Sequence, residues 1–386
     1  MPHSFDPLPE SCSPSFDLFF KPAKDAMKGM PPLTSGCNRP LQMTFEDHRK
    51  ALVFFHLNEH ASAQHLLQDL AEDDYAREHI APKDGIKKSS FSEATNSRGL
   101  EQFAYVFSNL QSQAAGIVPI RYPELGRLVA IDGSLIDAVL SMLWADYRKG
   151  SKKAWVHMGL DVNRSIPRKL FLTDGKGGER PFVSKILSDG ETGILDRGYQ
   201  SHQRFDLWLE ENILFVCRIK TGTKKTILKE NHVDPESIVF FDAIVLLGTP
   251  NVNQTQVPIR LVGYKIDDVQ YWIATDRHDL TAEQIALVYK LRWDVEKFFA
   301  WWKRHLKVYH LITRSEHGLM VQILAGLITY LLLAVYCHRK HNETVSIKRV
   351  RQLRIRIRNE IRISAAQIFK QYVNEQVKLK YLYAKT

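Results

Sequence analysis

The order of strand-like and helix-like runs between residues 128 and 219 constrains the fold of this 386-residue chain more than any other feature. Runs that alternate or are rich in β-branched residues predict strands, and runs with helical spacing predict helices. In order, the predicted elements are strands at 128–136, 153–162 and 168–174, a helix at 181–187, a strand at 192–199, a helix at 202–211 and a strand at 213–219. Three strands followed by helix, strand, helix and strand predict an α/β core.

This order is that of an RNase H-like core, an analogy of fold that says nothing about function by itself. Residues 220–277 read as a β-rich insertion, and the chain is helical after Asp279. The predicted organisation is a poorly ordered arm (1–43), a helical, DNA-binding region (44–120), the first part of the RNase H-like core (121–219), the β-rich insertion (220–277), core helices (278–345) and a basic helical C-terminal region (346–386).

Two carboxylates lie in or at the end of apolar predicted strands. Asp132 stands in Val-Ala-Ile-Asp-Gly-Ser, and Asp196 in Gly-Ile-Leu-Asp-Arg-Gly-Tyr. A partly buried carboxylate is unfavourable unless it is paired or bound to a cation, so two of them suggest a metal site. The alternative is that each one caps a turn with its side chain in water.

A third carboxylate lies on the predicted helix that begins at the capping box Thr281-Ala282-Glu283-Gln284. At about 100° per residue, four polar side chains of this helix fall within roughly 60° of arc. They are Tyr289, Arg292, Glu296 and Lys303. Glu296 could be a third metal ligand, and the side chains of Arg292 and Lys303 would then lie where the phosphate oxygens of a substrate approach. The alternative is an i, i+4 salt bridge between Arg292 and Glu296 on a solvated face.

These residues resemble the bacterial insertion-sequence transposases of the DDE superfamily, in the branch with the signature Y-(2)-R-(3)-E-(6)-K. All four letters and all three gaps match, and IDGS, LDRGY and a β-rich insertion occur in the expected order. The resemblance covers residues 128–306 well. It implies Asp132, Asp196 and Glu296 as catalytic residues and metal ligands, holding two Mg²⁺ ions per active site, for which Mn²⁺ may substitute.

The resemblance also implies the reaction and the partners. We expect cut-and-paste transposition through a hairpin intermediate, acting on double-stranded DNA at the terminal inverted repeats and the target, with a homodimer in the synaptic complex. Tyr289, Arg292, Lys303 and Arg197 are expected to contact DNA. The alternatives are a catalytically silent, repressor-like DNA-binding protein and an RNase H-like nuclease that does not join strands.

Trp272, just before the signature helix, resembles a tryptophan that stacks on a flipped base in hairpin-forming members of this branch. The alternative is a core tryptophan. Trp293, Trp301 and Trp302 are expected to pack in the interior.

The positive charge is concentrated at the C-terminus. Of the net +10, residues 348–386 carry eleven basic and two acidic side chains, or +9. Apolar residues recur there at helical spacing, which predicts an amphipathic helix whose arginines, including Arg354 and Arg358, line outer faces and contact DNA. The alternative is a solvated helix. Lys87 and Lys88, in a basic turn, are also predicted to contact DNA, although plain helical packing explains that region equally well.

The stretch 319–337 is long and apolar enough to cross a membrane, but we expect it to form a buried helix against the core sheet. Four cysteines without C-x-x-C spacing signal neither a disulfide framework nor a zinc site. With no export signal visible, we expect no membrane partner and a cytoplasmic, nucleoid-associated bacterial protein.

Overall fold

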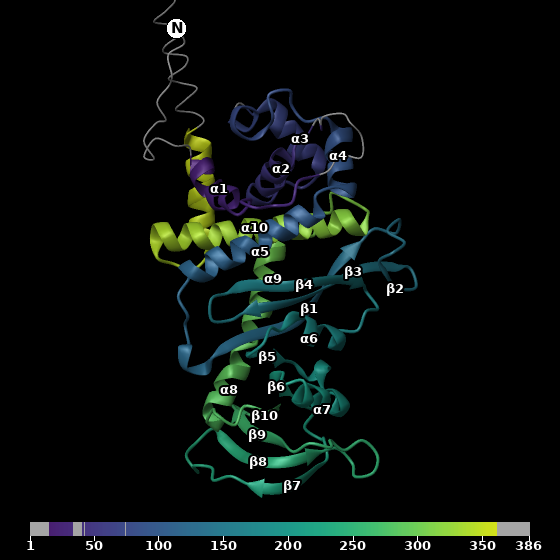
Figure 1. The fold of residues 1–386 in the computed structure, drawn as a ribbon, viewed down its shortest axis with the longest axis vertical. Coiled ribbons are helices and arrows are strands. Elements are labelled where there is room, and N and C mark those ends of the chain that lie inside the picture. Colours follow the sequence, from purple (N-terminus) through teal and green to yellow (C-terminus); the bar gives the residue numbers. More distant parts are fainter. Residues whose placement is uncertain (1–14, 34–40, 42, 74, 361–386) are drawn as a thin grey trace, which may run out of the picture. The chain divides into compact units, whose positions relative to one another are not determined.

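The computed structural model describes residues 15–33, 41, 43–73 and 75–360, and Figure 1 shows their helices and strands. The chain forms two compact units. One contains residues 118–303, and the other joins residues 1–117 to residues 304–386. The helical regions at the two ends of the sequence therefore belong to the same unit, which the sequence pattern alone does not reveal.

Residues 118–303 are built on one ten-stranded sheet. Its core strands are β1 (Arg127–Ala138), β2 (Asp146–Arg148), β3 (Ser151–Asp161), β4 (Ile166–Asp174), β5 (Glu191–Leu195) and β6 (Leu214–Arg218). β1 pairs antiparallel with β3 and parallel with β5, β3 pairs antiparallel with β4, and β5 pairs parallel with β6. The order β4-β3-β1-β5-β6 confirms the predicted RNase H-like α/β core.

Short helices between the core strands pack on this sheet. They are η4 (Arg180–Phe182), α6 (Val183–Ile186), η5 (Arg197–Tyr199) and α7 (His202–Glu210), while η3 (Pro123–Leu125) precedes β1. Ile186 of α6 and Trp208 of α7 are buried in one hydrophobic cluster with Ile131 of β1 and Leu195 of β5. These contacts fix β1 next to Asp132 and the end of β5 next to Asp196.

The β-rich insertion forms β7 (Lys225–Glu230), β8 (Val239–Leu247), β9 (Ile259–Ile266) and β10 (Val269–Thr275). The last strand pairs antiparallel with β6, from Ile273 opposite Arg218 to Thr275 opposite Val216. The four strands therefore continue the core sheet, as Figure 1 shows. The sequence predicts the strands of the insertion but not this continuation.

The predicted signature helix is divided into α8 (Ala282–Leu291) and α9 (Trp293–His305). The capping box at Thr281 is present at its start. At Arg292 the backbone switches to i to i−3 hydrogen bonds, from Arg292 N to Tyr289 O at 3.1 Å and from Val295 N to Arg292 O at 3.2 Å. The helix is therefore wound more tightly, as in a 3₁₀ helix, for about one turn around Arg292.

The other unit is helical. Its elements are α1 (Ser15–Asp25), α2 (Phe45–Leu57), α3 (Ala63–Glu72), the π-helical turn η2 (Ala76–Ile80), α4 (Lys88–Ser97), α5 (Leu100–Ile117), α10 (Glu316–His341) and a helix over residues 347–360. The prediction of a poorly ordered arm is wrong for α1, because Phe16, Phe19 and Phe20 are buried there. Residues 1–14, 34–40, 42 and 361–386 lie outside the described residues, so the predictions for those parts of the arm and for most of the basic tail are not tested.

The long apolar helix α10 could cross a membrane by length and composition, but 94% of its apolar window is buried inside the protein. The prediction of a buried helix is confirmed. Its predicted partner is wrong, because α10 packs mainly on α1, α2, α4 and α5 instead of on the core sheet. It is the central core helix of its own unit.

Candidate active site

The first two candidate carboxylates occupy equivalent positions on neighbouring parallel strands. The β1–β5 register runs from Arg127 opposite Glu191 to Ala130 opposite Ile194, a constant offset of 64 residues. The same offset carries Asp132 to Asp196, one residue past the end of β5. Adjacent strands lie about 4.8 Å apart, so this register brings the two side chains close together, just beyond the residues through which β1 and β5 pair.

Asp132 is surrounded by charge of its own sign. Its pKa is raised to about 6, mainly by burial and to a lesser degree by the carboxylates of Asp196 and Glu296, while the Gly133 N–H and the Arg292 guanidinium oppose the rise. The structure thus brings together the three carboxylates that the sequence singles out. A group of this kind needs more positive charge than the neighbouring side chains supply.

The signature residues of α8 and α9 surround Glu296. Arg292 Nη2 donates to Glu296 Oε1 at 2.5 Å, and its guanidinium lies 5.9 Å from the centre of the Tyr289 ring. The Arg292 side chain is 11% exposed and that of Glu296 34% exposed. The salt bridge given as the alternative therefore forms, but it lies partly buried among the other candidate residues and not on a solvated face.

Lys303 acts on β1. Its Nζ donates to the Leu135 carbonyl oxygen at 2.6 Å, three residues beyond Asp132 on the same strand. Burial lowers the pKa of Lys303. The last residue of the signature therefore joins α9 to the strand that carries the first aspartate.

The structure adds a fourth carboxylate that sequence reasoning missed. The pKa of Glu179 is raised to about 7, mainly by burial and then by the charges of Asp132 and Asp196. Its Oε1 lies so close to the Gly133 backbone that a β-carbon there would approach it to 2.3 Å. Glu179 lies in the glycine-rich sequence Gly-Lys-Gly-Gly-Glu-Arg, where neither a helical nor a strand-like pattern singles it out as a functional residue.

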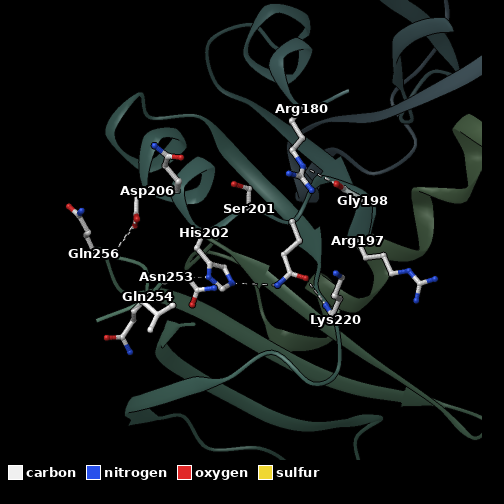
Figure 2. A pocket seen from close by; sticks show the side chains of 13 residues that line it. Arg180, Arg197, Gly198, Ser201, His202, Asp206, Lys220, Asn253, Gln254 and Gln256 are labelled. Carbon is white, nitrogen blue, oxygen red and sulfur yellow. Dashed lines mark hydrogen bonds between the residues drawn. The ribbon is translucent and has the colours of Figure 1, made fainter. Parts of the chain in front are cut away.

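A polar pocket of about 740 Å³ is lined by Arg197 and Gly198, the two residues that follow Asp196 in the chain (Figure 2). Arg180, Arg197 and Lys220 supply positive charge to it, and Arg180 Nε donates to the Gly198 carbonyl oxygen at 3.0 Å. Its far wall belongs to the insertion, where Asn253 O contacts His202 Nδ1 at 2.6 Å. Arg197, which is predicted to contact DNA, is exposed and directly follows Asp196 in the chain.

Trp272 is half-buried within the insertion. Its ring centre lies 5.2 Å from those of Phe240 and Phe241, and the Lys225 ammonium stands 4.0 Å from the ring centre. These contacts favour the interpretation as a packing residue. The prediction that Trp293 packs in the interior is wrong, because its side chain is 55% exposed. It lies nine residues from the fully buried Trp302, on the opposite side of α9.

The predicted DNA contacts of the helical unit differ in their surroundings. Lys87 caps α4 and Lys88 begins it, both exposed. Arg358 is exposed and lines a pocket. The prediction that Arg354 lines an outer face is wrong, because it donates to Glu59 Oε1 at 2.8 Å and to the Leu57 carbonyl oxygen.

The carboxylate residues beside β1 and β5 fit a divalent cation. All candidate ligands are carboxylate oxygens, the donors that Mg²⁺ and Mn²⁺ prefer. Burial, together with the neighbouring carboxylates, makes the charged forms of Asp132 and Glu179 unfavourable and raises their pKa values, and Arg292 is already paired with Glu296. A bound cation would stabilise the charged carboxylates.

Comparison with known proteins agrees with this geometry. The family model for the transposase DDE domain matches residues 123–332, more than half of the chain. A protein of Synechocystis sp. named as a transposase for insertion sequence element IS4SA is 24% identical over 276 residues, covering 69% of this chain and 76% of that protein. A protein of Sinorhizobium fredii named as transposase y4zB is 27% identical over 229 residues, covering 58% and 64%.

A third relative, from Geobacillus stearothermophilus, is named as a transposase for insertion sequence element IS5377. It is 27% identical over 234 residues, covering 59% of this chain and 61% of that protein. The chain therefore spans about three quarters of the first of these relatives and somewhat under two thirds of the other two. The matched region contains β1, β5 and α9, which carry the three candidate carboxylates. This chain belongs to the DDE family of insertion-sequence transposases, metal-dependent enzymes that act on DNA.

Proposed function

We propose that this transposase cleaves the ends of an insertion sequence and joins the freed 3′ ends to target DNA, by cut-and-paste through a hairpin intermediate. Asp132, Asp196 and Glu296 are the proposed catalytic residues. The observation that carries the proposal is their proximity, since Asp132 and Asp196 share the register of β1 and β5 and Glu296 of α9 lies close enough to affect the pKa of Asp132. We further propose that Mg²⁺ is the working ion, two per active site, and that Mn²⁺ can replace it.

The protein side chains divide the work of this site. Asp132 and Asp196 offer carboxylate oxygens from adjacent strands, and Glu296 offers a third from the helix. Arg292 holds Glu296 by a charge-assisted hydrogen bond, and Lys303 holds β1 through the Leu135 carbonyl. When bound, divalent ions supply activation of the attacking oxygen and neutralisation of charge at the leaving oxygen.

DNA is proposed to reach the site along the basic pocket. Arg197 and Lys220 line this pocket and carry positive charge. The carboxylates of the active site are negatively charged and would by themselves repel the phosphates of DNA, so these basic side chains are needed to attract it. The terminal inverted repeats, the target DNA, a homodimer in the synaptic complex and action in the bacterial cytoplasm at the nucleoid are parts of the same proposal.

A salt titration of DNA binding tests the role of Arg197. Because each phosphate contact releases about one counterion, we expect Arg197→Ala to reduce the slope of log K against log salt by about one. Arg148→Ala is the matched control, since Arg148 is an exposed arginine of β2 in the same unit. An equal change of slope in both variants would contradict a specific contact.

A strand-transfer assay tests the function as a whole. Pre-cleaved element ends, a target plasmid and Mg²⁺ are incubated with the full chain, and joined products are measured. A transposase yields joined products that EDTA abolishes. A nuclease would cut without joining, and a repressor-like protein would bind the ends with no dependence on Mg²⁺; either result would overturn the proposal.

A further inference from the structure

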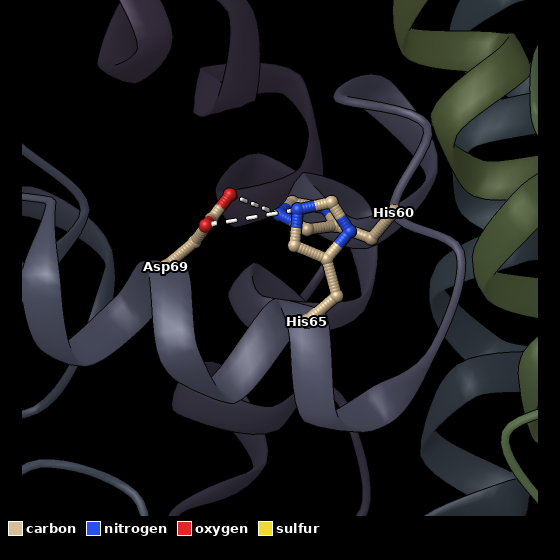
Figure 3. Close-up of side chains that lie close together, drawn as sticks. All are labelled: His60, His65 and Asp69. Atoms are coloured by element: carbon tan, nitrogen blue, oxygen red, sulfur yellow. Dashed lines mark hydrogen bonds and ion pairs between the residues drawn. The ribbon is translucent and has the colours of Figure 1, made fainter.

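Three potential metal ligands meet in the helical unit, outside the site described above. His60, His65 and Asp69 each offer one ligand atom, and these atoms lie within 4.8 Å of one another (Figure 3). His60 Nε2 lies 2.8 Å from Asp69 Oδ2, and His65 Nε2 lies 3.8 Å from Asp69 Oδ1. No step of transposition proposed above uses any of the three.

The local fold explains why they meet. The Ser62 hydroxyl accepts from the His65 N–H at 3.1 Å and so begins α3. His65 and Asp69 are four residues apart on this helix and therefore share a face. His60 lies in the short connection after α2, where its backbone N–H donates to the Phe55 carbonyl at 3.0 Å, and the residue is 1% exposed.

The buried His60 has acceptors at both ring nitrogens. Nδ1 lies 3.3 Å from the Phe55 carbonyl oxygen, while Nε2 faces the Asp69 carboxylate. A neutral imidazole has one N–H and can satisfy only one of these acceptors. With the proton on Nδ1, the Nε2 lone pair points at a carboxylate, an arrangement that a cation between them would relieve.

We propose that His60, His65 and Asp69 bind a divalent transition-metal ion, with Zn²⁺ as the best fit. Two imidazole nitrogens and one carboxylate oxygen are a donor set of zinc sites with an open fourth position. The contact from His60 Nδ1 to the Phe55 carbonyl is the outer hydrogen bond that ligating histidines make. This donor set distinguishes the site from the all-carboxylate active site, which suits harder ions.

The half-exposed His65 can adapt to the ion. Its side chain is 52% exposed, so the ring can turn about Cβ–Cγ and present either nitrogen. The contact that Nδ1 receives from the Ala61 N–H is long, at 3.5 Å. A pocket of about 340 Å³ adjoins His65 and Asp69, and it is also lined by Asp73 and Arg358. The open coordination position has room for water there.

The ion would join the connection after α2 to the first turns of α3. It would place positive charge beside Arg358, the residue of this pocket for which a DNA contact is predicted. Because the site is independent of the DDE carboxylates, loss of metal at one site leaves the other intact.

Metal binding to the full-length protein tests the proposal. Purified chain stripped with EDTA is titrated with Co²⁺, followed by its visible absorption, and then with Zn²⁺ to displace it. We expect one nitrogen-coordinated Co²⁺ per chain, and at least about tenfold weaker binding in His65→Gln and Asp69→Asn. His79→Gln is the control, since His79 lies in the same unit outside the cluster and is expected to bind as wild type.

Circular dichroism checks that each variant is folded, and the half-exposed position of His65 makes loss of fold unexpected. The absence of a nitrogen-coordinated ion in the wild type, or equal binding by wild type and His65→Gln, would overturn the proposal. Strand transfer in Mg²⁺ is measured in parallel. Strand transfer without a nitrogen-coordinated ion would contradict only the zinc site, whereas metal binding without strand transfer would contradict only the proposed function.

Discussion

Replacing Asp132 with asparagine is expected to abolish strand cleavage while leaving binding to the element's ends intact. The amide has nearly the same shape but lacks the charge that divalent ions require, so we expect cleavage to fall by about 10²–10³-fold or more. Cleavage of end-labelled DNA in Mg²⁺ measures the first effect, and a gel-shift assay in EDTA measures the second.

The same strand provides the matched control. Asp137 lies on β1 with its side chain 86% exposed and pairs with Lys153 at 2.6 Å. Asp137→Asn should therefore cleave as wild type does. Near wild-type cleavage by Asp132→Asn would remove Asp132 from the catalytic residues, and the same test applies to Asp196→Asn and Glu296→Gln.

The Asp132→Asn variant should also be more stable than wild type in EDTA. The folded-state pKa of about 6 lies above the ordinary value of 3.8, so the wild type loses stability as pH rises from about 4 to about 6. Above this range the charged carboxylate destabilises the fold by about 2–3 kcal/mol, which the neutral amide removes. A higher urea midpoint at pH 7.5 would show that lost cleavage does not reflect unfolding, whereas a lower midpoint would contradict this electrostatic account.

The largest expected effect on stability comes from Arg260→Met. Arg260 of β9 donates to both oxygens of Asp242 on β8, at 3.0 and 2.9 Å, and both residues are buried. It also donates to the carbonyl oxygens of Arg277 and Leu280, just before α8. Removing the guanidinium leaves a buried carboxylate without its cation, which should lower the free energy of unfolding by about 3–5 kcal/mol.

Urea unfolding measures this loss against two other variants. Lys265, also on β9, forms an exposed pair with Asp268 in the turn that follows, and Lys265→Met should change stability by less than about 1 kcal/mol. Adding Asp242→Asn to Arg260→Met should recover part of the loss, because the stranded charge is gone. If Arg260→Met and Lys265→Met had equal effects, the insertion would not depend on this buried pair.

The sequence predicts the core well because its signals are local. The apolar runs of β1 and β5 and the capping box at Thr281 each act over a few residues, and the structure confirms the elements that they predict. The equivalence of Asp132 and Asp196 was not predicted from the residues alone. It depends on a parallel register, which the sequence pattern does not state.

The features that sequence reasoning missed depend on contacts between distant segments. Glu179 comes from a glycine-rich turn and becomes a site residue only because the turn folds against Gly133. The prediction for Arg354 was wrong because Glu59, 295 positions away in the chain, pairs with it. The partner of α10 could not be read from its apolar composition, since a helix and a sheet offer equally apolar surfaces.

The most direct test of the central claim is to locate the ions in the complete protein bound to an element end. Crystals grown with Mn²⁺ give an anomalous signal that marks each ion. We predict signal within coordination distance of Asp132 and Asp196 and of Glu296, and its loss from this site in Asp132→Asn. Cleavage-competent crystals with no ion at these carboxylates would contradict the account.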